Sequence, residues 1–131
     1  MNAPRVQSDD LHTRNNQERA SDMPVDLAHL RRYTLGDKAL EAEVLELFLA
    51  QLPQTIAALR SAANEREWKI AAHTLKGSSR AVGAWRIATL AQEAEALAAI
   101  TEPKVWSEAI LRLEAAASEA SSFVKEAGER A

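Results

Sequence analysis

The sequence predicts an all-α protein, and two features of its composition carry that prediction. Alanine, the strongest helix former, accounts for 27 of the 131 residues, whereas only 4 Gly and 4 Pro are present to interrupt helices. Runs of β-branched residues, which are typical of strands, do not occur in the chain. A chain of this length suits one domain built around one hydrophobic core.

The N-terminal part of the chain divides into a polar segment and a short helix. Residues 1–22 have no apolar period, which predicts a disordered tail, and we expect the helical domain to occupy residues 23–131. A short helix is predicted within PVDLAHLRRYT, where Asp26 can cap the first turn. Its apolar stripe consists of Leu27, Leu30 and Tyr33. His29 lies off this stripe and is expected at the surface.

Four longer segments then repeat apolar residues every three or four positions, which is the period of an amphipathic helix. They run from Asp37 to about Asn64, from about Glu67 to Val82, from about Trp85 to Ile100, and from Pro103 to near Gly128. The pattern of the first consists of Leu40, Val44, Leu47, Phe48, Gln51, Leu52, Ile56, Leu59 and Ala63. Because such stripes are stable in water only when neighbouring helices bury them, we predict an antiparallel up-down-up-down four-helix bundle with a short extra N-terminal helix.

The charge and the residue inventory argue against several classes of protein. The 16 basic and 19 acidic side chains give a net charge of −3, whereas proteins that bind nucleic acid usually carry a basic excess. Without cysteine there is no disulfide, thiol nucleophile or cysteine-based zinc site. No apolar run reaches the roughly 20 residues of a membrane span, and the N-terminus lacks a signal pattern. We therefore expect a cytoplasmic protein with neither nucleic acid nor a membrane as partner.

His73 lies in the middle of the helix predicted from about Glu67 to Val82, and its position can be mapped because a helix turns about 100° per residue. The face opposite His73, which is the expected core stripe, consists of Trp68, Ala71, Leu75, Ser78 and Val82. The face around His73 consists of Arg66, Lys69, Ile70, Lys76, Gly77 and Arg80. The histidine is therefore expected to face solvent among four cationic side chains.

An exposed histidine on a charged helix face is most often without function, but two features argue otherwise here. The mapped face is purely basic, although the chain as a whole is acidic. Gly77 lies on the same exposed face, where a glycine costs a helix about 1 kcal/mol relative to alanine without serving the core. Close approach of a partner to the imidazole explains the missing side chain.

The spacing of residues along the sequence argues against other kinds of functional site. A di-metal site in a bundle needs Glu-x-x-His on two helices, but the third residue before His73 is Ile70. No HExxH zinc motif and no glycine-rich nucleotide loop occur, so neither a metal site nor ATP binding is expected. Ser78 is expected on the core face, and no strand–turn–helix elbow presents a nucleophilic serine.

These residues resemble a known family. The stretch AAHTLKGSSRAVGA, residues 71–84, looks like the signature of histidine-containing phosphotransfer (HPt) domains of bacterial multistep phosphorelays, approximately H-x-L-K-G-[SA]-[SA]-x-x-x-G-[AS]. Upstream, ELFLAQLPQTIAALRSAA is similar to the family's preceding helix, including its internal proline. Downstream, IATLAQEAEAL is similar to its following helix. The resemblance covers about residues 25–125, and six matched positions fall in one short window.

The resemblance implies a phosphocarrier that relays a phosphoryl group between the aspartate of a receiver domain, as in a hybrid histidine kinase, and a response regulator. His73 matches the histidine that is phosphorylated, Lys76 the lysine that neutralises the phosphoryl oxygens, and Gly77 the small residue that lets the receiver approach. The other matched positions are structural, namely Leu75 as a buried anchor, Ser78 and Ser79 as small packing residues, and Gly83 at the helix end. The resemblance assigns no kinase or ATP-binding activity to the chain.

The face mapping adds a docking surface that the motif does not contain. We expect an apolar patch with Ile70, ringed by Arg66, Lys69 and Arg80, to complement the acidic rim of a receiver domain. No cofactor is expected in this chain, because the receiver supplies the acidic pocket and its Mg²⁺. A monomer is the simplest state for a transient carrier.

Two alternatives stay open at this point. The chain could be a helical adaptor that binds a receiver without being phosphorylated, although an adaptor has no reason to keep His73, Lys76 and Gly77 together. It could also be a detached HPt module of a larger hybrid histidine kinase. The initial Met and the lack of kinase or receiver segments favour a separate carrier.

Overall fold

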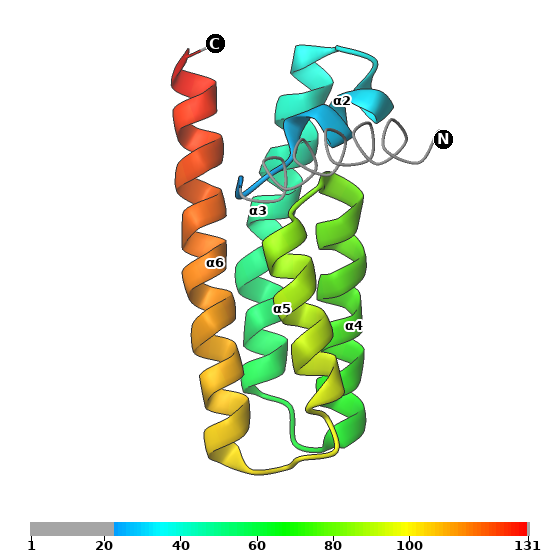
Figure 1. Cartoon of the computed structure of the whole chain (residues 1–131), viewed down its shortest axis with the longest axis vertical. Helices are drawn as coiled ribbons and strands as arrows, with labels where there is room; N and C mark the ends of the chain where they lie inside the picture. The colour runs from blue at the N-terminus through cyan, green and yellow to red at the C-terminus, as the bar shows by residue number, and fades with distance from the viewer. Residues whose placement is uncertain (1–22, 131) are drawn as a thin grey trace, which may run out of the picture.

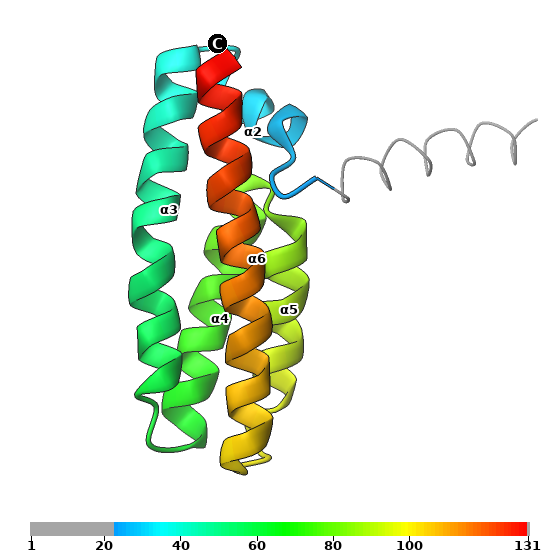
Figure 2. The ribbon, with the colours of Figure 1, turned by 90° about the vertical axis from the view of Figure 1, so that its left-hand side faces the viewer.

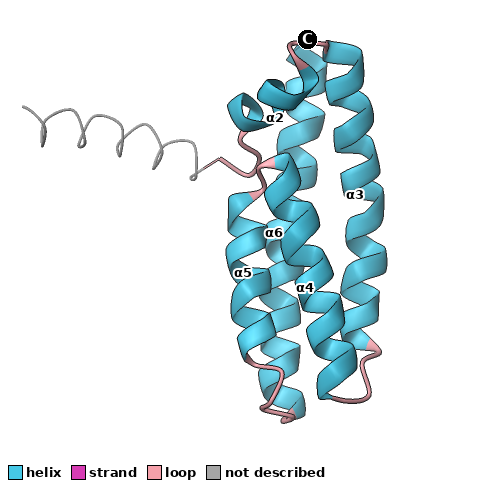
Figure 3. Ribbon diagram, turned by 90° about the vertical axis from the view of Figure 1, so that its right-hand side faces the viewer, coloured by secondary structure: helices cyan, strands magenta, loops and turns pink. Residues whose placement is uncertain are grey.

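The computed structural model describes residues 23–130, and its regular structure in this range is entirely helical (Figure 3). The helices are α2 (Leu27–Thr34), α3 (Lys38–Arg60), α4 (Glu65–Val82), α5 (Trp85–Ala96) and α6 (Pro103–Arg130). The predicted disordered tail, residues 1–22, lies outside the described residues, as does Ala131. None of the helices described is long and apolar enough to cross a membrane.

Helices α3 to α6 form an antiparallel bundle, with α2 packed across one end against α3 and α4 (Figure 1). Each bundle helix packs against its neighbours in the chain, and α6 closes the ring by packing against α3 (Figure 2). The predicted four-helix bundle and its short extra N-terminal helix are therefore confirmed. This order places α4 and α5 side by side, opposite the face where α3 meets α6.

Side-chain caps set the beginnings of three helices. The Asp26 carboxylate accepts from the His29 N–H at 3.2 Å, and Asp37 accepts from the Leu40 N–H at 3.0 Å, as the sequence predicts. Asn64 accepts from the Glu67 N–H at 2.9 Å, so α4 begins at once after Asn64, earlier than predicted. These bonds satisfy N–H groups that have no partner inside the helix.

The predicted ends of the helices differ from those observed. Helix α3 stops at Arg60, short of the predicted Asn64, and α5 stops at Ala96, short of Ile100. Helix α6 instead continues through Gly128 to Arg130, because one exposed glycine weakens a helix without ending it. Periodicity locates the middle of a helix better than its ends, where caps and turns decide.

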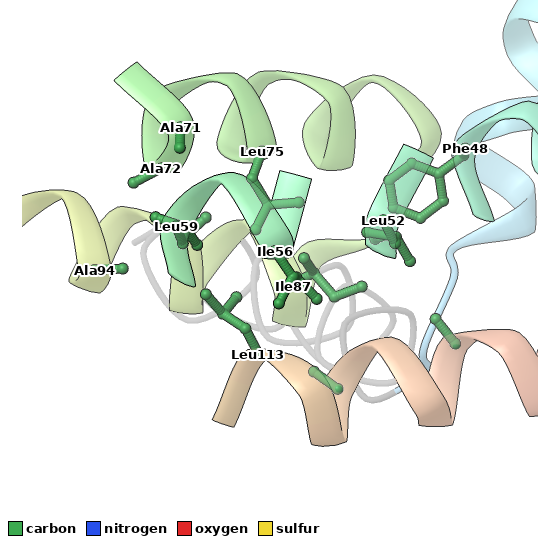
Figure 4. Close-up of a cluster of buried hydrophobic side chains, with 14 of the residues drawn as sticks. Phe48, Leu52, Ile56, Leu59, Ala71, Ala72, Leu75, Ile87, Ala94 and Leu113 are labelled. Carbon is green, nitrogen blue, oxygen red and sulfur yellow. The ribbon is translucent and has the colours of Figure 1, made fainter. Parts of the chain in front are cut away.

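The core lies along the axis of the bundle and draws on all four long helices (Figure 4). Its buried residues include Phe48, Leu52, Ile56 and Leu59 of α3, Leu75 of α4, Ile87 of α5 and Leu113 of α6. The predicted inward pattern of α3 is wrong at four positions, since Leu40, Leu47, Gln51 and Ala63 are exposed. Leu45, which the pattern left out, is buried. Tyr33 of α2 is also 70% exposed rather than buried, because the inward positions of this helix are Leu30 and Thr34, four residues apart.

The turn between α4 and α5 holds α2 in place. The Asp26 N–H donates to the Gly83 carbonyl at 2.9 Å, and the Trp85 indole N–H donates to the Asp26 carboxylate at 2.9 Å. The His29 ring packs edge-on against Trp85, with centroids 4.8 Å apart, so the expected surface histidine is half-buried. Gly83 has φ +83°, and a Cβ there would lie 2.8 Å from the Asp26 carbonyl oxygen.

We expect Gly83→Ala to lower the free energy of unfolding by about 2–4 kcal/mol, through the left-handed backbone and the clash with Asp26. Gly36 is the matched control, because it has φ +80° but nothing within 4 Å of the position that a methyl group would take. Gly36→Ala should therefore cost only about 1 kcal/mol, the backbone strain alone. Urea unfolding of the two variants checks this. Equal losses of unfolding free energy would show that the contact with Asp26 adds nothing to the cost of Gly83→Ala.

Candidate functional site

His73 lies on the outer surface of α4, and a carboxylate from the neighbouring helix contacts its ring. The His73 side chain is 69% exposed, and its Nδ1 lies 2.9 Å from Oε2 of Glu95. Glu95 belongs to the last turn of α5, which runs antiparallel beside α4 (Figure 3). Two helices therefore build the site, although the predicted residues all come from one.

The same carboxylate binds Lys76. The Lys76 ammonium donates to Oε1 of Glu95 at 2.6 Å, and the two side chains are 16% and 18% exposed. This hydrogen bond is the main cause that lowers the pKa of Glu95 below its ordinary value; partial burial opposes the shift, and the bond with His73 adds to it. Glu95 is consequently ionised near neutral pH, held between two basic side chains.

The charge of Glu95 determines which nitrogen of His73 carries the proton. An ionised carboxylate has no proton to donate, so the bond of 2.9 Å requires a hydrogen on Nδ1 of His73. In the neutral ring the other nitrogen, Nε2, then holds the lone pair. The pair Glu95–His73 thus fixes an exposed imidazole in the tautomer whose Nε2 is the nucleophilic nitrogen.

The other predicted docking residues lie at the surface around His73. Arg66, Lys69 and Arg80 are exposed, and Ile70 is 55% exposed. A shallow depression of about 740 Å³ on this face is lined by Glu95 and by residues between Asn64 and Thr74, at the beginning of α4. Arg80 bonds Gln92 of α5 at 2.7 Å, which ties it to the side of the face away from that depression.

Gly77 lies on the exposed side of α4, one turn after His73. A Cβ built on this glycine would meet nothing within 4 Å. Packing inside the protein therefore does not require the missing side chain. Side chains in a helix lean toward its N-terminus, so a side chain at position 77 would lean over the His73 turn. The glycine keeps the approach to the imidazole open.

Two predictions about this face are wrong. The strip around His73 is not purely basic, because Glu95 lies between His73 and Lys76 and leaves Lys76 largely covered. On the core side, Ser79 is fully buried whereas Ser78 is half-buried, so the core stripe includes position 79 rather than 78. Helix geometry alone places only the residues of α4, so it could not include a side chain contributed by α5.

The sequence carries only part of the signal for Glu95. Gln92 and Glu95 stand one turn apart on α5, and they pair with Arg80 and Lys76, which stand about one turn apart on α4. Helical spacing places Gln92 and Glu95 on one face of α5, but it does not say which residues of α4 that face meets. Among the side chains described, those of residues 23–128, no three His, Asp or Glu gather as they would to hold a metal ion.

Comparison with known proteins identifies the family. The family model described as the Hpt domain matches residues 43–123, more than half of the chain. The chain therefore belongs to the Hpt domain family. A search of curated protein sequences found no match.

Two solved structures share the fold. Histidine-containing phosphotransfer protein B (HptB) from Pseudomonas aeruginosa PAO1 has a TM-score of 0.73 and 20% sequence identity, over 82% of this chain and 96% of that chain. The HPT domain of an Hpt sensor hybrid histidine kinase from Shewanella has a TM-score of 0.65 and 21% identity, with the same two coverages of 82% and 96%.

The family match gives the class of function, and the two solved structures show the shared fold. The chain acts in histidine phosphotransfer within phosphorelay signalling. Proteins of this class are phosphocarriers rather than kinases, and receiver domains and kinases are their general partners.

Glu95→Gln should lower the free energy of unfolding at neutral pH by about 1 kcal/mol, because the ion pair with Lys76 is lost. The folded-state pKa of Glu95 is lowered, so its contribution is complete above the ordinary glutamate pKa of about 4.3 and is lost as pH falls through the lower folded value. Urea unfolding from pH 7 to pH 3 should show the variant and the wild type converging in acid.

Glu119→Gln is the matched control for this experiment. Glu119 pairs with Arg86 at 3.8 Å, and its side chain is 54% exposed, so its replacement should change stability by less than about 0.5 kcal/mol at every pH. A gap between wild type and Glu95→Gln that stays constant down to pH 3 would contradict the lowered pKa.

Proposed function

We propose that His73 is the residue phosphorylated in this chain, and that it exchanges the phosphoryl group with an aspartate of a receiver domain. The observation that carries the proposal is the exposed imidazole whose Nδ1–H is bonded to Glu95, at 2.9 Å. That bond leaves the lone pair on Nε2, where a receiver can reach it. The chain supplies a positioned nucleophile for group transfer.

The proposed transfer needs no additional acid or base. The Nε2 lone pair of His73 attacks the phosphorus of the aspartyl phosphate, the N–P bond forms, and the P–O bond to the aspartate breaks. The aspartate leaves as a carboxylate, and the ring becomes an imidazolium whose Nδ1 keeps its proton. The Glu95 carboxylate already lies 2.9 Å from that nitrogen and stabilises the positive charge as it develops.

Lys76 supports this arrangement from the other side of the carboxylate. Its ammonium holds Glu95 ionised, and an ionised Glu95 is what keeps the proton on Nδ1 of His73. The resemblance also gives Lys76 the role of neutralising the phosphoryl oxygens directly, and that role stays a prediction. Neither role consumes Lys76 or adds a proton transfer, so the reaction can run in both directions.

The receiver is expected to dock on the face that surrounds His73. Gly77 admits the receiver close to the ring, and Ile70 offers apolar surface beside it. The exposed cations Arg66, Lys69 and Arg80 surround this contact and complement the acidic rim of a receiver. Charge complementarity of this kind raises the rate of encounter more than it raises affinity, which suits a transient partner.

We assign the metal ion of the reaction to the receiver. The carboxylate that contacts His73, that of Glu95, is already bonded to two basic side chains, and this donor set does not suit Mg²⁺, which prefers several oxygen ligands. The chain accordingly acts without a cofactor of its own and without autonomous kinase or ATP-binding activity. We further propose that its working unit is residues 23–131, acting as a cytoplasmic monomer.

Labelling from a phosphorylated receiver domain tests the assignment of His73. Wild-type protein should take up the phosphoryl group and hold it in an acid-labile, base-stable form, and His73→Gln should take up none above background. His29→Gln is the control, because it removes the other histidine of the described helices and should label as the wild type does. A chain that binds the receiver tightly yet never labels would instead be the non-phosphorylated adaptor.

Replacement of Gly77 should separate stability from function. Because Gly77 is exposed in mid-helix with open space around it, Gly77→Ala should raise the free energy of unfolding by about 1 kcal/mol. Gly77→Gln should slow transfer from the receiver by about tenfold or more, since overpacking a close contact costs roughly 1–3 kcal/mol. Rapid-quench labelling measures the second effect.

Gly128 provides the control, because it is a helical glycine of α6 that also has nothing within 4 Å. Gly128→Gln should leave the transfer rate unchanged. If Gly77→Gln transfers at the wild-type rate as well, the open space over His73 does not serve the receiver.

A further inference from the structure

Helices α3 and α6 continue past α4 and α5, toward the end of the bundle where α2 lies (Figure 2). Helix α5 has 12 residues and α4 has 18, whereas α3 has 23 and α6 has 28. At this end α3 and α6 therefore lack the cover that α4 and α5 give them along the rest of the bundle. Helix α2 packs against α3 and α4 instead.

A groove follows the seam between α3 and α6. A hollow of about 600 Å³ lies at the end near α2, and a second of about 330 Å³ continues it along the seam. Leu49 and Ser121 line both hollows, so the two form one elongated groove, the α3–α6 groove. Its apolar floor includes Leu45, which is buried, and Leu49 and Val124, which are half-buried.

The shape of the α3–α6 groove favours a helix as its occupant. The lining residues extend along α3 from Lys38 to Arg60, which is about 33 Å of helix. Two antiparallel helices leave a groove between them into which the side chains of a third helix can pack. Pro53 has no N–H to donate to the Leu49 carbonyl, and both residues line the groove, so that acceptor stays available to an occupant.

The charges along the α3–α6 groove indicate the chemistry of that helix. Two ion pairs on its rim neutralise their own charges, namely Arg31–Glu41 at 2.8 Å and Arg60–Glu114 at 3.0 Å. The other charged residues of the lining are Lys38, Lys125 and Glu46, and none of them makes an ion pair with a described side chain. Cations are thus in excess at the end near α2, although the chain as a whole is acidic. Acidic residues on the flank of a docking helix would complement them.

We propose that the α3–α6 groove binds an amphipathic helix of another protein, whose acidic flank pairs with Lys38 and Lys125. The seam of α3 and α6 lies opposite α4 and α5, which carry His73 and Glu95. A helix bound in the groove therefore leaves the imidazole open to a receiver. The binding requires no phosphorylation of His73, so it goes beyond the proposed function and gives the chain a second partner that it can hold during transfer.

Two designed peptides test the proposal. Each is a helix of about 18 residues, roughly 27 Å long, with leucine at helical spacing and either glutamate or lysine at the flanking positions. Fluorescence anisotropy should show that the wild-type protein binds the acidic peptide about tenfold more tightly, because two exposed charge pairs attract one peptide and repel the other. The double variant Lys38→Gln with Lys125→Gln should lose this preference.

A second pair of variants tests the place of binding. Ser121→Trp should fill the α3–α6 groove and weaken binding of the acidic peptide about tenfold or more. Ser122→Trp is the matched control, because Ser122 is equally exposed but lines neither hollow, and it should bind as the wild type does. Absence of binding to the acidic peptide, equal binding of the two peptides, or equal effects of the two tryptophans would overturn the proposal.

Labelling by a phosphorylated receiver, with the acidic peptide at saturation, tests whether His73 stays open. Transfer should proceed at the rate seen without peptide, whereas a block would place the peptide on the face around His73 and refute the second site. Sedimentation of the free protein identifies another occupant: a dimer that the peptide dissociates would show that a second copy of the chain fills the groove. Failure of labelling without peptide would contradict only the proposed function, because peptide binding is measured separately.

Discussion

The burial of Trp68 is the constraint on which the site depends. Its side chain is fully buried, its ring stacks on Trp106 at 4.4 Å, and its indole N–H donates to the Ala94 carbonyl at 2.6 Å. These contacts fix the rotation of α4, and His73, five residues later and about 140° further around, is thereby turned outward. The same hydrogen bond holds the last turn of α5, where Glu95 follows Ala94 directly. One buried indole therefore positions both sides of the site around His73.

The electrostatics of the site follow from one carboxylate between two bases. Glu95 fixes the proton on Nδ1 of His73, and Lys76 keeps Glu95 ionised. For the proposed phosphoryl transfer this arrangement needs no change of hydrogen-bond partners, since the proton stays on Nδ1 of His73 while the ring gains its charge. A carrier benefits from such a site because the forward and reverse reactions meet the same environment.

The helix that carries His73 combines features that stabilise the bundle with features that do not. Its inward side is closely packed, with Trp68, Ala72 and Leu75 almost completely buried. On its outward side, Gly77 lowers the helix propensity and Ile70 is exposed to water. Neither feature stabilises the bundle. Local departures from good helix design are expected where a surface must meet another protein.

The sequence by itself determined the helices, the bundle and the outward position of His73, because apolar spacing and helix geometry are properties of each segment alone. It also located the caps at Asp26 and Asp37, where a side chain bonds its own helix. Contacts between helices could be identified only from the tertiary structure. Glu95 lies 22 residues from His73 along the chain, and only the register of α5 against α4 brings the two within 2.9 Å. That register is set by packing around Trp68 and Ala94, which no single-helix pattern encodes.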